Sequence, residues 1–151
     1  MKKVVISALL IGLLTGCVAQ HANFVRTEQQ GQTIVSIDPI VKASLEILQQ
    51  KFPPARSSLK VAITNDSMSA PLITQLRQLG YAVYEISPQP QQPATPEGVP
   101  DSAQRMAYFF DVLDQQHSLY QLTIQVDKAK MSTVFKLEHG QYKQVSPWTV
   151  F

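Results

Sequence analysis

The first residues with a spacing that supports chemistry are a serine and a lysine three positions later, in Ser57-Ser58-Leu59-Lys60. Penicillin-binding enzymes use this S-x-x-K spacing with the serine at a helix start, so that the lysine reaches its hydroxyl one turn later. Here the following residues alternate as in a strand, which directs positions 57 and 60 to opposite faces. The companion S-D-N and K-T-G motifs are absent from the sequence. We therefore interpret the serines as the entrance to a strand, and an envelope hydrolase is the least favoured function.

Acidic and histidine side chains are the other candidates for chemistry. Asp111 and Asp114 form a candidate acid pair, but in a predicted strand positions three apart point to opposite faces. The histidines, His21, His117 and His139, lie in a polar segment and two turns without the spacing of metal ligands. The sequence therefore predicts no catalytic residue, no metal site and no cofactor.

Cys17 is the single cysteine of the chain, and it stands at the end of a hydrophobic run. A short basic start, Met1-Lys2-Lys3, precedes residues 4–14, in which Ser7 is the one polar side chain. This arrangement is typical of a signal peptide. As a helix the apolar run would rise about 16 Å, roughly half of a bilayer core, so it is not a permanent span. We predict that residues 1–16 are a signal peptide.

The four residues Leu14-Thr15-Gly16-Cys17 resemble the bacterial lipobox. That resemblance implies that the Cys17 thiol is diacylated, that the chain is cut before the cysteine, and that the new amino group is acylated. The alternative is ordinary cleavage after Ala19, which would leave the lipobox match to chance. Each buried methylene contributes about 0.8 kcal/mol, so several acyl chains bind a membrane tightly. We therefore predict Cys17 as the lipidation site and membrane anchor.

Removal of the signal peptide changes the charge of the chain. The full sequence has 13 basic and 11 acidic residues, and loss of Lys2 and Lys3 leaves 11 of each. A basic footprint for nucleic acid is missing, so nucleic acid is not an expected partner. The remaining length is that of one domain.

The first half of this chain predicts a tether and a strand, helix, strand unit. Residues 17–37 are polar and glutamine-rich after the lipidated cysteine, and we interpret them as a tether. Asp38 as N-cap, with proline next, starts a helix that must end by Phe52, because two prolines follow. A strand over residues 59–63, with Leu59, Val61 and Ile63 on one face, precedes a second helix and a strand over residues 81–86. The strands are expected to pair in parallel with a right-handed crossover.

The second helix has its own start and stop signals. One face of this predicted helix holds the apolar residues Met68, Leu72, Leu76 and Leu79. Pro71 lies in its first turn, and Gly80 is the predicted C-terminal cap. Residues 65–67, Asn-Asp-Ser, match a glycosylation sequon but are predicted to form a turn and helix cap.

The second half predicts strands after a proline-rich stretch. Residues 87–103 hold five of the ten prolines and are expected to be a loop outside the core. Strands follow over residues 106–113, 119–126, 131–138 and 142–145, with a hairpin turn at His139-Gly140. Residues 106–113 also fit a helical stripe, but their aromatic content favours a strand. The predicted fold is therefore α/β (α+β): one two-layer domain over residues 38–151, with two helices packed on a mixed sheet whose C-terminal strands are antiparallel.

Aromatic residues in this half are candidates for the core or for an interface. Burial is the commoner fate of Phe109, Phe110 and Trp148, although the C-terminal Trp-Thr-Val-Phe tail offers a docking segment. Trp148 and Phe151 are the candidate partner-binding residues.

Several of these pieces, in this order, resemble the TrbH family of conjugal-transfer lipoproteins. They are the lipobox Cys17, Phe52-Pro53-Pro54-Ala55, the LRQLGYAV segment from Leu76 to Val83, the proline-rich break, the LYQLTIQV strand from Leu119 to Val126, and SPWT around Trp148. The resemblance implies a component of the mating-pair-formation apparatus, a type IV secretion system, anchored in the outer membrane of a Gram-negative cell. Val18 in place of aspartate after the cysteine fits sorting to that membrane.

Three classes of function remain open from the sequence. The favoured one is a non-enzymatic, structural or assembly lipoprotein of a conjugative secretion system, lipid-anchored with its domain facing the periplasm. Its expected partners are other envelope proteins of the secretion complex and the membrane through the anchor, with a homo-oligomeric ring as a candidate assembly. The alternative is a lipoprotein regulator or assembly factor of another cell-envelope machine, and the hydrolase is third.

Overall fold

The structure is a computed structural model that describes residues 35–86 and 98–151. Cys17, the predicted signal peptide and most of the predicted tether lie outside these residues, as do residues 87–97 of the proline-rich stretch. The elements, in chain order, are α1 (Asp38–Lys51), the 3-10 helix η1 (Pro54–Arg56), β1 (Ser58–Ala62), α2 (Ser69–Gln78), β2 (Ala82–Ile86), β3 (Gln104–Asp114), β4 (Leu119–Val126), β5 (Ala129–Glu138), β6 (Gln141–Gln144) and β7 (Thr149–Val150).

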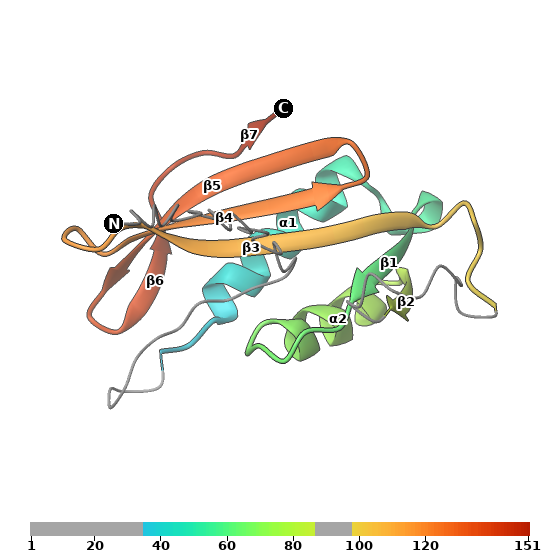
Figure 1. Ribbon diagram of the computed structural model, residues 1–151, viewed down its shortest axis with the longest axis horizontal. Coiled ribbons are helices and arrows are strands. Elements are labelled where there is room, and N and C mark those ends of the chain that lie inside the picture. The colour runs from blue at the N-terminus through green and yellow to red at the C-terminus, as the bar shows by residue number, and fades with distance from the viewer. Residues whose placement is uncertain (1–34, 87–97) are drawn as a thin grey trace, which may run out of the picture.

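The strands form one mixed sheet in the order β2-β1-β3-β4-β5-β6, with β7 also paired to β5 (Figure 1). β1 pairs in parallel with β2 on one side and with β3 on the other. All later pairs between named strands are antiparallel. This confirms the predicted α+β fold, including the antiparallel C-terminal strands and the assignment of residues 106–113 to a strand.

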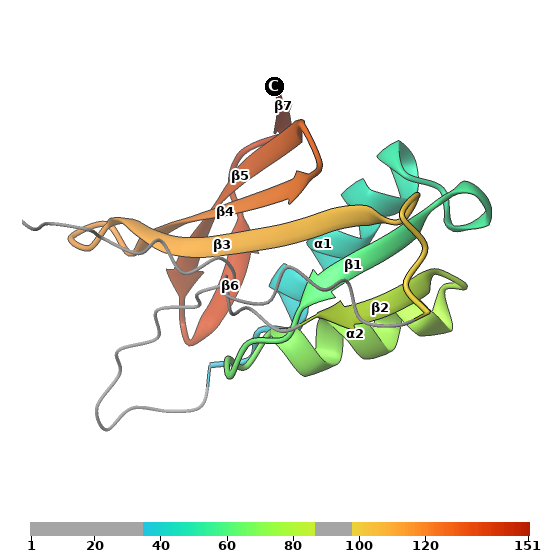
Figure 2. The same cartoon turned by 45° about the vertical axis from the view of Figure 1, so that its right-hand side comes forward.

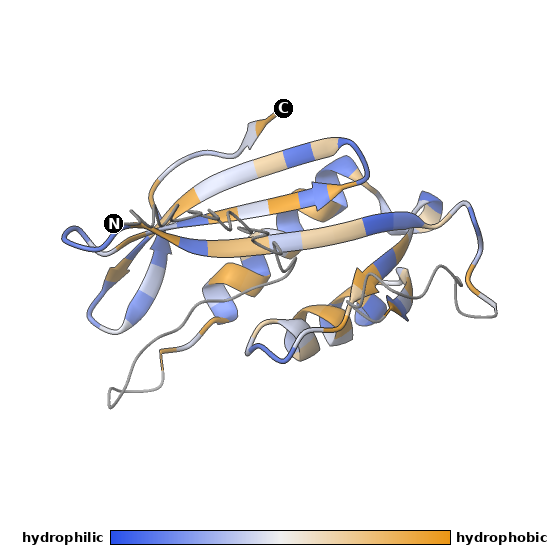
Figure 3. Cartoon of the chain, viewed as in Figure 1, coloured by the Kyte–Doolittle hydropathy of each residue, from blue (hydrophilic) through white to orange (hydrophobic). Residues whose placement is uncertain are grey.

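Both helices lie on the same side of the sheet, as Figures 1 and 2 show. α1 contacts β6 and α2, while α2 contacts β2, so together they reach across the sheet. Side chains alternate accordingly: on β3, Met106, Tyr108 and Phe110 are buried toward the helices, while Arg105 and Asp111 are exposed on the other side. Figure 3 shows the resulting hydrophilic and hydrophobic bands along the strands. No described helix or strand covers the second face of the sheet.

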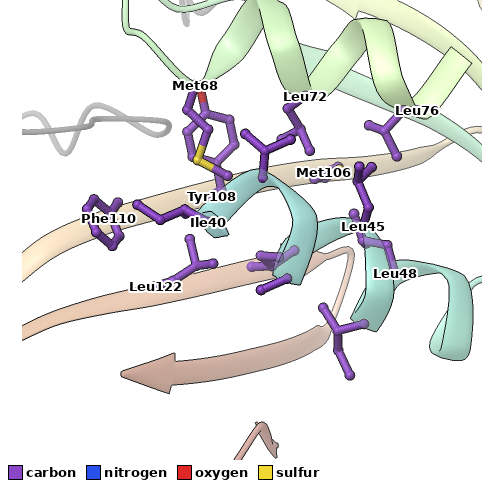
Figure 4. Packing of buried hydrophobic residues seen from close by; sticks show 14 of the residues in the cluster. Ile40, Leu45, Leu48, Met68, Leu72, Leu76, Met106, Tyr108, Phe110 and Leu122 are labelled. Atoms are coloured by element: carbon purple, nitrogen blue, oxygen red, sulfur yellow. The ribbon is translucent and has the colours of Figure 1, made fainter. Parts of the chain in front are cut away.

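The core fills the space between the helices and this sheet. Figure 4 shows residues of both helices and of β3 and β4 directed toward one another. Phe110 lies at one end of this core, where its ring stacks on Tyr120 with a centroid distance of 5.5 Å and meets Phe135 and Tyr142 edge-on. These aromatic contacts join three antiparallel strands and β6, so they link the hairpins into one packed unit.

α1 starts differently from the prediction. Asp38 is the first helical residue and Ile37 is the N-cap, with no side-chain cap. The Asp38 carboxylate instead accepts a hydrogen bond from the Ser36 hydroxyl at 2.7 Å. The Asp38 N-cap prediction is therefore wrong by one residue, because proline is tolerated throughout the first turn and does not fix the boundary. The predicted end at Phe52, before the two prolines, is confirmed.

The predicted faces of β1 and α2 extend one residue too far. Ile63 follows the end of β1 and is 45% exposed, and Leu79 follows α2 and is 37% exposed. Both residues continue the apolar spacing, but β1 and α2 end one residue before them, so their side chains are not held against the core. The cap at Gly80 is confirmed: it has φ +89°, and the N–H of Tyr81 donates to the carbonyl of Leu76 at 3.1 Å, as in a Schellman motif.

The N-terminal end of the described chain joins the β6 edge of the sheet, at the other end of the strand order from β2. Ser36 forms a parallel bridge with Gln141 of β6, and Val35 and Ile37 pack against the core. These residues belong to the range predicted as a tether. In the proline-rich range, Ala103 is likewise buried next to β3, while Asp101 and Ser102 are exposed.

Candidate functional site

The most concentrated polar cluster lies between the loop before α2 and the middle of β3. The Tyr108 hydroxyl donates to the Asp66 carboxylate, 2.8 Å from each of its two oxygens. Thr64 contacts both groups, with its hydroxyl 2.5 Å from Asp66 Oδ2 and 3.1 Å from the Tyr108 oxygen. Tyr108 is fully buried whereas Thr64 and Asp66 are partly exposed, so these contacts lie at the edge of the core.

Asp66 also caps α2. Its Oδ1 accepts hydrogen bonds from the backbone N–H groups of Met68 at 2.9 Å and Ser69 at 2.8 Å. The carboxylate therefore satisfies two of the N–H groups that a helix start leaves without partners, and its charge is favourable at that end of the helix dipole. The prediction of a turn and cap at residues 65–67 is confirmed. The contact with Tyr108 was not predicted, because nothing local in the sequence relates two residues that are 42 positions apart.

The chemistry of this cluster is structural. Burial raises the pKa of Tyr108, and the nearby Asp66 carboxylate raises it further. The phenol is therefore neutral at physiological pH and acts as a hydrogen-bond donor, not as a base. Both carboxylate oxygens of Asp66 are engaged with the loop, the helix start or β3, so the cluster fastens α2 to the sheet.

Ser57 and Lys60 are separated as predicted. Ser57 is buried immediately before β1, whereas Lys60 lies within β1 between the buried residues Leu59 and Val61. Because side chains alternate along a strand, Lys60 lies on the uncovered side of the sheet and Ser57 on the helix side. The serine and lysine are therefore not brought together as S-x-x-K chemistry requires.

The two candidate acidic residues and the described histidines lie at different places in the hairpins. Asp111 is exposed on the uncovered side of β3. Asp114 follows a register shift at the end of β3, where its carboxylate accepts a hydrogen bond from the backbone of Gln116 and lies 2.7 Å from His117 Nδ1. The side-chain hydrogen bond with His117 lowers the pKa of Asp114. His139 occupies the predicted hairpin turn with φ +51°.

Metal ligands are not gathered anywhere in the described parts of the chain: no three His, Cys, Asp or Glu side chains there have a suitable arrangement. His21 lies outside those parts.

The C-terminal tail, which holds both candidate partner-binding residues, completes the edge of the sheet. Val145 donates its N–H to Val134, while Thr149 lies opposite Ser132, so residues 146–148 form a bulge between β6 and β7. Trp148, in this bulge, packs against the core and keeps part of its surface exposed. Phe151 is 71% exposed, although its backbone N–H bonds to the carbonyl of Lys130 at 2.8 Å.

Comparison with known families assigns the chain. The family model described as Conjugal transfer protein TrbH matches residues 18–151, which is all of the given sequence after the predicted lipidation site. The chain belongs to the TrbH family. Membership makes this TrbH protein a conjugal transfer protein, an envelope-associated component that works with other proteins of the transfer complex. Neither a curated protein nor a solved structure matches it significantly.

The described helices of this TrbH protein do not supply a membrane span, since none of them is long and apolar enough.

Proposed function

We propose that this TrbH protein is an outer-membrane lipoprotein with a structural or assembly role in a conjugative type IV secretion apparatus, and that it is not an enzyme. The observation that carries the proposal is the TrbH match over residues 18–151, which begins immediately after a lipobox cysteine. Acylated Cys17 would hold the chain in the membrane, and the α+β domain would bind another envelope protein.

The arrangement of polar groups supports a non-catalytic role. Asp66 and Tyr108 are engaged in fastening α2 to the sheet, and Asp114 is engaged in a turn. Ser57 and Lys60 lie on different sides of β1. Among the described candidates, Asp66, Tyr108 and Asp114 therefore have structural partners, while Ser57 and Lys60 point to different sides of the sheet and so cannot act together.

Anchoring would favour assembly through concentration. Residues 17–34 connect the proposed anchor to the described domain, and 18 residues can span at most about 60 Å. The domain would then stay near the membrane surface, where the effective concentration of a membrane-bound partner is high. A modest interface would be sufficient for assembly under these conditions.

A complementation experiment tests the anchor and the role together. Donor cells lacking the gene would receive the native gene, the Cys17→Ser variant, or a Ser57→Ala, Asp111→Asn, Asp114→Asn triple variant. We expect Cys17→Ser to abolish acylation, leave the membrane fraction or remain an unprocessed precursor, and lower DNA transfer strongly. The triple variant should impair DNA transfer far less than Cys17→Ser does.

Two results would overturn this proposal. Wild-type transfer after deletion of the gene, with the other transfer genes intact, would exclude the role in conjugation. A native mature chain that starts at Gln20 and carries no lipid would exclude the anchor.

A further inference from the structure

We propose that the uncovered face of the sheet binds an acidic surface of another protein of the transfer complex. The inference rests on the proposed function for the presence of such a partner. We call this surface the basic face and define it by the outward side chains of β1, β3, β5 and β6 that carry charge: Lys60, Arg105, Asp111, Asp114, Lys130, Lys136, Glu138 and Lys143.

Strand alternation places these side chains on one face. Most of them lie next to a residue that is buried toward the helices, and Glu138 lies two positions from Lys136 on the same strand. Asp114 is placed by the register, because it pairs with Leu119, which in turn pairs with Lys136. An ion pair of 2.8 Å between Lys136 and Glu138, two positions apart on β5, agrees with a shared face. The basic face carries five basic and three acidic side chains, a formal net charge of +2.

The helix side of the domain has no such excess. The charged residues of α1, α2 and β2 are three basic and three acidic: Lys42, Lys51, Arg77, Asp38, Glu46 and Glu85. Arg77 and Glu85 pair directly at 2.6 Å. The positive charge is therefore a property of one face, as expected where a partner of opposite charge binds.

Two like-charged pairs on the basic face oppose the stability of the sheet. Lys60 lies directly across from Arg105 on the neighbouring strand, and Lys136 lies directly across from Lys143. Like charges in this position are destabilising. Glu138 offsets the repulsion in the second pair. The hydrogen bond that it accepts from Lys136 lowers the pKa of Glu138, and the charge of Lys143 contributes to the same shift. Within residues 35–86 and 98–151, Lys60 and Arg105 have no ion-pair partner. An acidic partner would relieve this repulsion.

The centre of the face has the composition of a protein interface. Phe109, on a central strand, is partly exposed there. Next to it, Gln121 donates to the Ser132 hydroxyl at 2.8 Å, and Thr123 lies 3.3 Å from the same hydroxyl. A central aromatic residue with a charged rim is typical of protein interfaces. Surface binding to a membrane typically uses a helix with apolar side chains that enter the headgroup layer, so a face made of strands favours a protein.

Charge reversal that relieves the like-charged pairs tests the proposal without weakening the fold. The Lys60→Glu, Lys143→Glu double variant places an acid opposite Arg105 and another opposite Lys136, so each pair becomes attractive. The matched control, Lys42→Glu with Lys51→Glu, changes the charge equally at exposed positions of α1. Both are made in the full chain in donor cells, and thermal unfolding of the purified proteins checks that each is folded.

A photo-crosslinking amino acid locates the contact in the same cells. It replaces Phe109 on the basic face or Thr74, an exposed residue of α2, as the control. We expect an adduct with another transfer protein from position 109 and none from position 74. The Lys60→Glu, Lys143→Glu variant should lose this adduct and lower transfer at least tenfold, while the Lys42→Glu, Lys51→Glu variant retains both.

Other outcomes overturn the inference in identifiable ways. Native transfer and an unchanged adduct in the Lys60→Glu, Lys143→Glu variant would show that the basic face binds no acidic partner. An adduct from position 109 that contains lipid and no protein would assign the face to the membrane. If deletion of the gene itself leaves transfer unchanged, the proposed function fails. If deletion abolishes transfer while the reversed variant restores it fully, the inference alone fails.

Discussion

The Tyr108 hydroxyl lies 2.8 Å from both carboxylate oxygens of Asp66, so the centre of β3 is joined directly to the start of α2. Asp66 accepts this hydrogen bond while it also caps the helix with two backbone hydrogen bonds. One carboxylate therefore orients the helix relative to the sheet. This carboxylate therefore adds to the core packing that holds α2 on the sheet.

Asp66→Ala is expected to lower the free energy of unfolding by about 2–4 kcal/mol. Loss of the cap costs about 1 kcal/mol, and loss of the carboxylate that accepts the hydrogen bond of the buried Tyr108 hydroxyl costs about 1–3 kcal/mol more. Urea unfolding followed by circular dichroism measures the difference.

Tyr108→Phe is the matched control for this cluster. It removes the hydroxyl but leaves the cap in place, so we expect a loss of about 1 kcal/mol. In the double variant the two losses should not add, because both remove the same contact. Additive losses would show that the Asp66–Tyr108 hydrogen bond contributes little to stability.

Stability is expected to decrease above pH 10. Burial raises the pKa of Tyr108, and burial, with Tyr120 nearby, raises the pKa of Tyr142 to about 12. The folded state therefore favours the neutral phenols, so their contribution is complete below the unfolded pKa of 10.0 and is lost as pH rises through the folded values. Each such tyrosine contributes a slope of about 1.4 kcal/mol per pH unit in this window.

Thermal midpoints measured from pH 8 to pH 12 test this dependence. Tyr108→Phe should show a shallower decline than the native protein above pH 10, because one of the linked groups is gone. Lysines also titrate in this range, but they do so in both proteins, so the difference between the native protein and Tyr108→Phe reports on Tyr108. Parallel curves would contradict the assigned role of Tyr108.

Gly80→Ala is expected to destabilise the protein by about 1–2 kcal/mol. Gly80 has φ +89°, a conformation that costs an L-residue about this much. The added Cβ would lie 4.0 Å from the nearest atom, Pro54 Cβ, so the cost comes from the backbone and not from a clash. Gln78→Ala, at an exposed position of α2, is the control and should be neutral or slightly stabilising. Chemical unfolding of both variants measures the difference, and equal stabilities would contradict the cap.

Removal of residues 149–151 is expected to lower stability by about 1–2 kcal/mol and to cause association. β7 and Phe151 pair with β5 over residues 130–132, and their loss leaves that edge open to other chains. Urea unfolding and light scattering would detect the two effects. Phe151→Ala alone should change stability by less than about 0.5 kcal/mol, because its side chain is largely exposed. A large effect of Phe151→Ala would show that the side chain, not the strand pairing, stabilises the tail.

Local features of this protein were determined by the sequence itself. The end of α1 before two prolines, the cap at Gly80, the Asp66 cap and the turn at His139 all follow from neighbouring residues. Each depends on φ preferences or on hydrogen bonds over a few positions, which a short stretch of sequence contains in full. The alternation of the later strands is local in the same sense.

The tertiary structure alone decided how these elements meet. It placed β1 between β2 and β3, left one face of the sheet uncovered, and brought Lys60 opposite Arg105 and Tyr108 against Asp66. It also exposed Ile63 and Leu79, because an apolar period shows which residues share a face but not where the covering element ends. Such contacts depend on which long-range packing arrangement has the lowest free energy after loop closure, and that is a property of the whole chain.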